Sequence, residues 1–382
     1  MDQQTARKLY EEGAIFVFLN VPEGTEFGID MKSWNTGEKF RGVKMIPPGL
    51  HYIFYSAVSN TGDTAPRTGF FHNFRKGEVL VKKWDEVNEC VSAEIVSDEE
   101  IVKLKENLRA LDTFLGPYPY DIQERWKSLT SDLTDDLVKS LVPLSGYIQS
   151  ALELESCSDA DRPKGKKPDK DKQDSAEDSL PSDAKRLRTS GNMEDTLLPH
   201  LKAKVGTELR LTKFPEKNYP DGSTPADITK HSLDSSYVFE MVVSSYEKPG
   251  NIIGELQFCY ICFLVGHSLE AFDQWKKIFS LFCSCETVIK KYRRLYNRFL
   301  SVIEAQVEEV PEEFLADIVT NNNFVYVKLR QLFRTIQGLE IDGEIKTKAE
   351  RLKESLTDLY EWDFGHLESE DEDEAPVIVE VS

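Results

Sequence analysis

The sequence predicts an α+β multidomain protein, with an N-terminal antiparallel β-sandwich-like domain that carries flanking helices and a C-terminal all-α domain. Three observations lead to this prediction. Short runs of β-branched and aromatic residues, separated by turns, fill the chain between residues 14 and 84. Apolar residues recur at helical spacing in the second half. The length of 382 residues exceeds what one hydrophobic core usually supports, so two domains are expected.

The first domain is predicted to span residues 1–154 and to begin with strands. Ala14–Leu19 is an apolar run that is followed by the turn residues Pro22 and Gly24. Further strands are predicted at 40–46, 51–57, 69–74 and 78–84, with Pro- or Gly-containing turns after several of them. Several short strands at this spacing favour an antiparallel sandwich over a parallel sheet with crossover helices.

Helices are expected to close the first domain. Ser97 is followed by Asp98, Glu99 and Glu100, a pattern typical of a helix N-terminus. The apolar residues that follow keep helical spacing up to the stop at 116–117: Ile101, Leu104, Leu108, Leu111 and Leu115. Two more helices are predicted at 119–131 and 133–153.

Residues 155–195 are predicted to form a disordered linker of mixed charge. No aromatic residue occurs between Tyr147 and Phe214, although aromatic residues make up 10% of the chain. A stretch so poor in large apolar side chains cannot bury enough surface to offset the entropy lost on ordering. The basic clusters at 166–167 and 185–188 could form a nuclear import signal, but a solvated linker is the favoured interpretation.

The second domain, residues 196–366, is predicted to be helical apart from one candidate strand at 207–212. A helical pattern fills 225–246, and the region at 256–281 is dense enough in apolar residues to be central to the domain. The next apolar residues repeat at three- and four-residue spacing and form a core-facing stripe: Val288, Tyr292, Leu295, Phe299 and Ile303. Helices predicted at 312–320, 322–337 and 343–360 would complete a helical bundle or a stacked-helix array.

The charge balance argues against nucleic acid as the main ligand. The chain has 47 Lys and Arg against 67 Asp and Glu, a formal net charge of −20, so on average its surface repels phosphate backbones and anionic lipid. The first eight residues show no secretory signal, and the longest apolar run, near 256–265, is half of what a membrane-spanning helix needs. We expect an intracellular protein with free thiols and no membrane contact.

The sequence offers few candidates for catalysis or metal binding. Cys259, Cys262, Cys283 and Cys285 could supply four thiolates to zinc, but their neighbours are apolar and favour core packing. No two His residues lie three or four positions apart, and no nucleotide-binding or hydrolase motif occurs. We therefore predict no enzyme, no metal and no cofactor, with a hydrolase of dispersed active-site residues as a rival.

A basic segment at 290–298 provides the alternative function. It holds five cations with Tyr292 and Tyr296 between them, so it could bind RNA by stacking bases on the rings. Both tyrosines also belong to the apolar stripe, which places them in the core and the cations on a solvated face. The solvated face is the favoured interpretation.

Residues 367–382 form an acidic tail with a β-prone segment. Six of the seven residues at 368–374 are acidic, and residues 375–381 have high β-propensity. An exposed extended segment of this kind can add itself as a strand to the sheet edge of another protein. The alternative is that this segment packs on the first domain of its own chain or has no role.

Two long motifs carry a family resemblance, NVPEGTEFGID at 20–30 and FRGVKMIPPGLH at 40–51. They resemble motifs of the a1-alpha2-repression family of U5 snRNP assembly factors for pre-mRNA splicing. Shorter matches lie at 69–71, 114–120, 206–210, 224–232, 254–258 and 270–276, so that the resemblance covers both domains but not the charged linker.

The resemblance implies a helical domain of VHS-like type and no catalysis. It implies binding to the large U5 scaffold protein, through the RNase H-like and Jab1/MPN-like domains of that partner, which blocks premature engagement of helicase and RNA. The tail strand that pairs with the scaffold in the family maps onto five residues: Val377, Ile378, Val379, Glu380 and Val381. We expect a monomer in cytoplasm and nucleus, and no direct nucleic acid as the main ligand.

Overall fold

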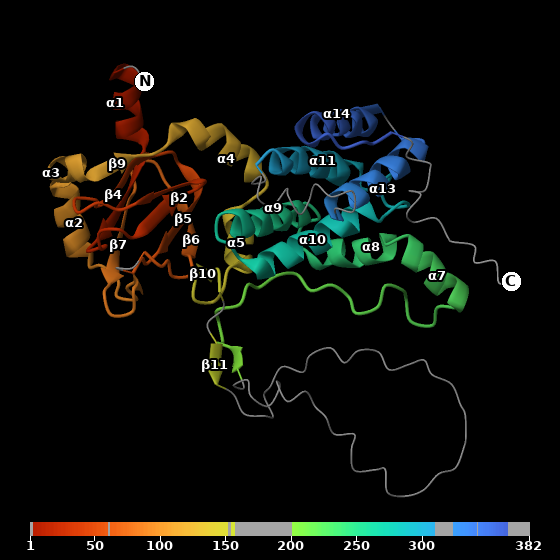
Figure 1. The fold of residues 1–382 in the computed structure, drawn as a ribbon, viewed down its shortest axis with the longest axis horizontal. Helices are drawn as coiled ribbons and strands as arrows, with labels where there is room; N and C mark the ends of the chain where they lie inside the picture. Colours follow the sequence, from red (N-terminus) through yellow and green to blue (C-terminus); the bar gives the residue numbers. More distant parts are fainter. Residues whose placement is uncertain are drawn as a thin grey trace, which may run out of the picture.

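The computed structural model describes residues 3–59, 62–151, 154–156, 201–309, 324–341 and 343–365. The two sheets and a few helices occupy one side of the molecule, and most of the helices occupy the other (Figure 1), which confirms the predicted α+β class. The predicted helix at 312–320, the acidic tail and most of the predicted linker lie outside the described residues.

Ten strands of the first part form two five-stranded sheets. The first sheet has the order β8 (Cys90–Val91), β7 (Val79–Asp85), β1 (Ala14–Leu19), β4 (Gly42–Ile46) and β9 (Leu115–Pro117). The second has the order β10 (Ile148–Gln149), β6 (Thr68–Phe74), β5 (Gly49–Ser56), β2 (Glu26–Ile29) and β3 (Lys32–Asn35).

The first sheet contains two parallel pairs, unlike the wholly antiparallel sheets expected. β1 runs parallel to β7, and β4 runs parallel to β9. A parallel pair needs a long connection that returns the chain to the same end of the sheet. Between β1 and β7 that connection includes most of the second sheet instead of a helix, so hairpin spacing alone could not reveal it.

β1 is buried on both faces, which explains its unbroken apolar sequence. Phe16 and Phe18 point between the two sheets, where the Phe16 ring stacks on Phe27 of β2 with centroids 5.7 Å apart. Ile15 and Val17 point to the opposite face. That face is covered by α2 (Asp98–Glu106) and α3 (Leu108–Leu111), which place the predicted apolar stripe against the sheet.

The centre of the second sheet, above all β5, is also buried on both faces, because it lies between the first sheet and the helical part. Along β5, Ile53 and Tyr55 point into the sandwich, whereas Tyr52 and Phe54 belong to the core of the helices. Phe71 of β6 stacks on Phe258 of the helical part with centroids 5.4 Å apart. One hydrophobic core therefore extends from the second sheet into the helices.

The remaining elements of the first part are α1 (Gln3–Glu12), η1 (Asp112–Phe114), η2 (Tyr120–Ile122), α4 (Gln123–Leu129) and α5 (Asp135–Leu141).

The helical part is built around α9. The helical part contains α7 (Pro225–Leu233), α8 (Ser236–Ser245), α9 (Asn251–Leu264), α10 (Leu269–Cys283), α11 (Arg293–Val307), α13 (Phe324–Gly338) and α14 (Gly343–Tyr360). α9 is buried on nearly every side, and it packs against α5, α10 and α11.

Several predictions of secondary structure were wrong. Leu115, expected on the helical stripe, lies in β9, and the helix expected over 225–246 is divided into α7 and α8. The helix expected over 133–153 ends at Leu141, because Pro143 disfavours helical backbone at Val142, and the chain then enters β10. The strand expected at 207–212 is absent from that described segment, which instead runs as irregular chain beside α9 and α10.

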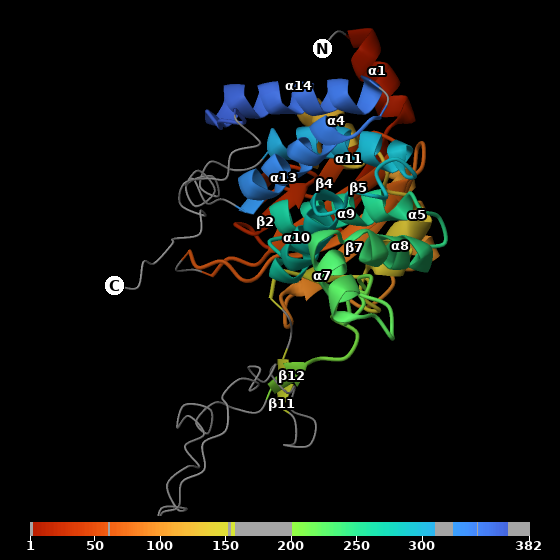
Figure 2. The ribbon, with the colours of Figure 1, turned by 90° about the vertical axis from the view of Figure 1, so that its right-hand side faces the viewer.

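A small ribbon joins the two boundaries of the linker. β11 (Leu154–Ser156) pairs antiparallel with β12 (Leu201–Ala203), so that Ser156 lies opposite Leu201. The ribbon projects away from both parts of the molecule (Figure 2).

Gly28 lies where the ring of Phe54 crosses β2, and we predict that Gly28→Ala destabilises the protein. The added Cβ would lie 2.1 Å from Cζ of this buried ring. Overpacking of this kind lowers the free energy of unfolding by about 1–3 kcal/mol. Chemical denaturation followed by tryptophan fluorescence measures the change, and Gly37→Ala is the control because a Cβ there meets nothing within 4 Å. Equal stability of both variants would contradict the close packing.

Candidate functional site at the junction of the two parts

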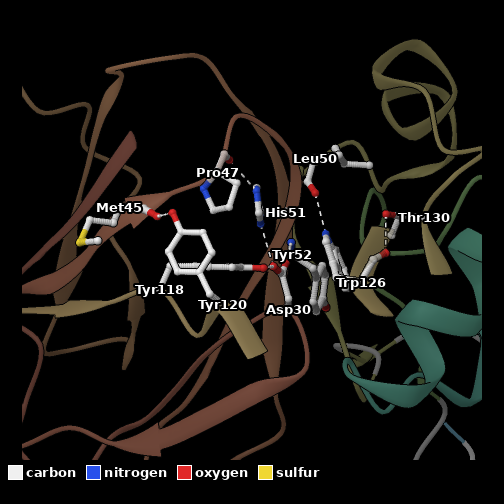
Figure 3. Close-up of polar contacts among 10 residues, drawn as sticks. All are labelled: Asp30, Met45, Pro47, Leu50, His51, Tyr52, Tyr118, Tyr120, Trp126 and Thr130. Carbon is white, nitrogen blue, oxygen red and sulfur yellow. Dashed lines mark hydrogen bonds and ion pairs between the residues drawn. The ribbon is translucent and has the colours of Figure 1, made fainter. Parts of the chain in front are cut away.

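A buried carboxylate organises the junction, which we define as the contact of β5 and β6 with α4, α5 and α9. Asp30, in the turn between β2 and β3, is fully buried. Its Oδ1 accepts the backbone N–H of Tyr52 at 3.0 Å, and its Oδ2 accepts the hydroxyl of Tyr118 at 2.6 Å. Nδ1 of His51 lies 2.7 Å from the same Oδ2 (Figure 3). Three partners therefore satisfy this carboxylate.

The second ring nitrogen of His51 is also occupied. Nε2 lies 2.8 Å from the carbonyl oxygen of Pro47. A carbonyl oxygen only accepts hydrogen bonds, so Nε2 must carry a proton, while Nδ1 shares a proton with the carboxyl group of Asp30. Burial, together with the charge of Asp30, raises the pKa of Tyr118, which keeps its hydroxyl a donor. No ring atom is left to take a proton from a substrate, so the pair is structural.

Three motifs that carry the family resemblance meet at this centre. Asp30 ends the motif at 20–30, His51 ends the motif at 40–51, and Tyr118 and Tyr120 belong to the motif at 114–120. The hydroxyl of Tyr120 donates to the carbonyl oxygen of Met45 at 2.6 Å (Figure 3). These motifs therefore fix the backbone of the sandwich against the segment that leads to α4.

Trp126 carries the connection into the helices. Its Nε1 donates to the carbonyl oxygen of Leu50 at 2.8 Å, and its ring stacks on His51 with centroids 6.5 Å apart. Thr130, after α4, donates to the carbonyl oxygen of Trp126 at 2.7 Å (Figure 3). α4 itself packs on α11, so Trp126 and its helix form one of the links between the first part and the helical part.

Gln257 of α9 holds the loop between α4 and α5. Its side chain is fully buried. Oε1 accepts the backbone N–H of Asp132 at 2.8 Å, and Nε2 donates to the carbonyl oxygen of Ser128 at 3.2 Å and to Oγ of Ser131 at 3.1 Å. Arg298 of α11 forms an ion pair with the Asp132 carboxylate. Side chains from α9 and α11 of the second part thus hold the loop between α4 and α5 of the first part in place.

Arg67 forms a second polar contact across the junction. Its guanidinium binds both carboxylate oxygens of Glu26, at 2.6 and 3.2 Å, and lies over the ring of Phe54. Nη1 also donates to the carbonyl oxygen of Val265, in the loop between α9 and α10, at 2.8 Å. His267 Nε2 lies 2.9 Å from the same nitrogen and must accept, and burial together with the Arg67 charge lowers the pKa of His267.

Glu255 of α9 is a second fully buried carboxylate. It accepts the backbone N–H and hydroxyl of Thr212 at 3.0 and 2.6 Å, the Tyr246 hydroxyl at 2.9 Å and Nε2 of Gln274 at 2.9 Å. These contacts hold the segment at 207–212 as irregular chain, which is why the expected strand does not form. Glu255, Gln257 and Gln274 all fall within the shorter motifs at 254–258 and 270–276.

Among the predicted binding residues that the structure describes, Arg298 of the basic segment reaches this junction through its ion pair with Asp132. Val377, Ile378, Val379, Glu380 and Val381 lie outside the described residues. In the basic segment, Tyr296 is fully buried and donates to the carbonyl oxygen of Phe282, and the Tyr292 ring packs on Phe239. This confirms that the tyrosines face the core, so they offer no stacking platform for RNA.

The four clustered cysteines lie in the core, as predicted. Cys259, Cys262, Cys283 and Cys285 are almost fully buried, and burial raises the pKa of every one of these thiols, that of Cys285 to about 12. Within the described ranges, no group of three or more His, Cys, Asp or Glu side chains could hold a metal ion. None of the helices in that part of the chain is long and apolar enough to cross a membrane.

The fold and the junction define a two-part α+β protein whose buried polar side chains fix one part against the other. A family model described as the AAR2 N-terminal domain matches residues 12–143, and one described as the AAR2 C-terminal repeat region matches residues 211–365. The chain therefore belongs to the AAR2 family, which confirms the resemblance found in the sequence.

Similar proteins match along almost their whole length. The mouse protein named "Protein AAR2 homolog" is 39% identical over 388 residues, and its human counterpart is 38% identical over 386 residues. Both alignments cover 100% of this chain and 97% of the relative. The yeast protein named "A1 cistron-splicing factor AAR2" is 21% identical over 379 residues, which cover 95% of this chain and 96% of the relative.

Asp30→Asn is predicted to destabilise the protein strongly. The substitution replaces a buried carboxyl group that contacts Tyr52, Tyr118 and His51, and breaking a buried pair in this way costs about 3–5 kcal/mol in the free energy of unfolding. Urea denaturation at neutral pH measures the loss. Asp121→Asn is the control, because Asp121 is exposed where it pairs with Lys32 and its removal should leave stability nearly unchanged. A loss for Asp30→Asn as small as that of the control would show that these three contacts do not stabilise the fold.

The buried thiols are predicted to resist alkylation in the native protein. A maleimide reacts with the thiolate, and burial both raises the pKa of these thiols and blocks access. Peptide mass spectrometry after brief treatment at neutral pH should find half-buried Cys90 labelled and Cys259, Cys262, Cys283 and Cys285 unlabelled until the protein is denatured. Rapid labelling of the four, or stoichiometric release of zinc on labelling, would favour the metal-site interpretation.

Proposed function

We propose that this protein is a non-enzymatic assembly factor of the U5 snRNP in pre-mRNA splicing. The observation that carries the proposal is the match over nearly the whole chain to a relative named as a splicing factor. Matches of both family models, on the two sides of the linker, support it. The proposed compartments, cytoplasm and nucleus, follow from a role in assembling a particle for splicing.

The proposed mechanism is competitive occupancy of a scaffold surface. The protein would bind the large U5 scaffold protein through the RNase H-like and Jab1/MPN-like domains of that partner, and so exclude helicase and RNA until assembly is complete. The junction supports this mechanism, because it fixes the two parts relative to each other. A rigid monomer that presents a broad surface loses little conformational entropy on binding.

The absence of catalysis is part of the proposal. The acid–imidazole pair of Asp30 and His51 is the arrangement in the described residues that most resembles catalytic machinery. Both residues are almost fully buried, and both ring nitrogens of His51 are engaged. A substrate would have no atom of this pair to contact, which favours a binding function over hydrolysis.

Direct RNA binding through residues 290–298 is the alternative, and the structure favours it less. Its tyrosines are packed in the core, Lys291 pairs with Glu240 at 2.6 Å, and Arg298 pairs with Asp132. RNA binding that weakens with salt and is lost in Arg293→Glu/Arg294→Glu would revive this alternative.

Deletion of residues 375–382 is predicted to weaken scaffold binding without unfolding the protein. The proposed strand at 377–381 would contribute backbone hydrogen bonds and alternating side chains to the sheet of the partner. Isothermal titration against the purified scaffold domains should show a loss of about tenfold or more in affinity. The thermal midpoint should not change.

A matched pair of substitutions distinguishes the effect of strand pairing on scaffold affinity from the effect of amino-acid composition. Val379→Pro removes a backbone N–H and should weaken binding about as much as the deletion, whereas Val379→Thr keeps the N–H and the β-propensity and should bind nearly normally. Unchanged affinity of the deletion variant would exclude the tail as a binding strand. Failure of the intact protein to bind the scaffold at all would refute the proposed function.

A further inference from the structure

α13 presents a basic surface in an otherwise acidic protein. The sequence of Phe324–Gly338 contains Lys328, Arg330 and Arg334 and no Asp or Glu, although the whole chain carries a net charge of −20. Arg334 is exposed on the outer side of the helix. Lys328 turns toward α10, where its Nζ lies 3.3 Å from Oγ of Ser284. A helix with this composition attracts anionic chain segments.

A groove adjoins this surface and extends its positive charge. It has a volume of about 560 Å³ and lies between α8, α10, the start of α13 and the segment at 214–218. Phe214, Val238, Leu281 and Phe324 provide apolar walls, while Lys276 and Lys277 of α10 stand on its rim. Asp273 is the one carboxylate among the residues that line it, and it pairs with Lys276 at 2.8 Å. Lysines exceed carboxylates at this groove.

The chain leaves the described structure beside this basic surface. Phe364 packs on Tyr326 of α13 with ring centroids 5.3 Å apart, and the carbonyl oxygen of Gly365 accepts a hydrogen bond from Nη1 of Arg330 at 3.2 Å. Arg330 and Phe324 are six residues apart in the helix, a rise of about 9 Å along its axis. The groove therefore begins about 9 Å along α13 from the point where Gly365 is held.

The residues that follow have the charge and the reach to occupy this surface. Residues 368–374 contain six acids and no base. At about 3.3 Å for each extended residue, they can extend from about 10 to about 30 Å beyond Gly365. That span is sufficient to pass around the outer side of α13, over Arg334, and to reach Lys328, Lys276 and Lys277 on the groove side.

We propose that the acidic run at 368–374 docks on its own chain, across the basic face of α13 and onto the lysine rim of the groove. Each exposed ion pair contributes little by itself. Several pairs form together here, and the short connection to Gly365 gives the acidic run an effective concentration in the millimolar range at the groove. Ion pairs too weak to hold two separate molecules together can therefore form between the acidic run and the groove of the same chain.

Docking of the acidic run would regulate the segment that follows it. Residues 375–381 come directly after the acidic run, so docking holds this β-prone segment against the helical part. A binding partner must then displace the acidic run, or compete with the cations beneath it, before the strand is free to pair. This consequence rests on the function proposed above, whereas the docking itself does not require a partner.

Zero-length cross-linking of the full chain tests the docking directly. A carbodiimide joins a carboxylate to a lysine amine only where the two are in contact. Peptide mass spectrometry should find cross-links from residues 368–374 to Lys276, Lys277 and Lys328, and these should disappear at high salt. Lys103, exposed on α2 in the first part, is the internal control. Cross-links to these lysines no stronger than those to Lys103 would overturn the proposal.

An equal mixture of ¹⁵N-labelled and unlabelled protein shows whether the acidic run that occupies the groove belongs to the same chain or to a second copy. Intramolecular docking yields cross-linked peptides in which both members carry the same isotope. Mixed pairs as abundant as like pairs would show that the acidic run of a second copy fills the groove, and this result would also overturn the proposal.

A charge-reversal variant tests the same contact without removing every reactive lysine. Lys277 and Arg334 are both exposed, so Lys277→Glu/Arg334→Glu should fold normally, and Lys103→Glu/Lys105→Glu in α2 is the matched control. The first variant should lose the cross-links to Lys276 and Lys328, and a glutamyl endopeptidase should cleave its residues 368–374 about threefold faster or more. The control should behave as the unmodified protein, and equal cleavage of the two variants would refute the docking.

Scaffold affinity separates this inference from the proposed function. If the docking and the proposed function are both correct, Lys277→Glu/Arg334→Glu should bind the scaffold domains more tightly than the unmodified protein. The reason is that the proposed strand at 377–381 is then no longer held against the helical part. If the cross-links form but deletion of 375–382 leaves scaffold affinity unchanged, the docking stands and the tail has no role in binding. If the cross-links are absent while the deletion weakens binding, the docking is refuted and the binding strand stands.

Discussion

The burial of β5 on both faces is the constraint on which the rest of the structure depends. β5 sends alternate side chains into two cores, Ile53 and Tyr55 into the sandwich and Tyr52 and Phe54 into the helices. α4 and α5 belong to the first part by sequence, yet they fill the core of the second. Removal of either part would expose an apolar surface on the other. The two parts should therefore unfold together in one transition, unlike independent domains on a linker.

This shared core accounts for the buried polar groups at the junction. A backbone that passes between two packed layers leaves polar groups with no access to water, and an unsatisfied group there costs free energy. Asp30, Gln257 and Glu255 supply the missing partners to backbone and hydroxyl groups. Motif residues in this family member thus have a clear structural use. Long, specific motifs indicate a demanding backbone arrangement as readily as they indicate catalysis.

Periodicity predicted the elements that are long and regular. Ala14–Leu19 and Gly343–Tyr360 have the predicted bounds, and Ser97 caps its helix as expected. β2 and β3 were missed because Gly28 interrupts one strand and polar residues fill the other. The junction could not be predicted, because its contacts join residues far apart in the sequence, such as Asp30 and Tyr118. Of the candidate sites, the sequence correctly assigned Tyr296 and the cysteines to the core, whereas the tail strand remains a prediction.

The ribbon of β11 and β12 makes the stability of the fold nearly independent of the length of the linker. Because Ser156 lies opposite Leu201, the segment at 157–200 leaves and re-enters the structure at the same place. The entropy of closing a loop changes slowly with its length, by about 0.6 kcal/mol for each doubling. Insertions and deletions within 157–200 should therefore be nearly neutral for stability. Neither family model extends into residues 144–210, a range that includes this whole segment.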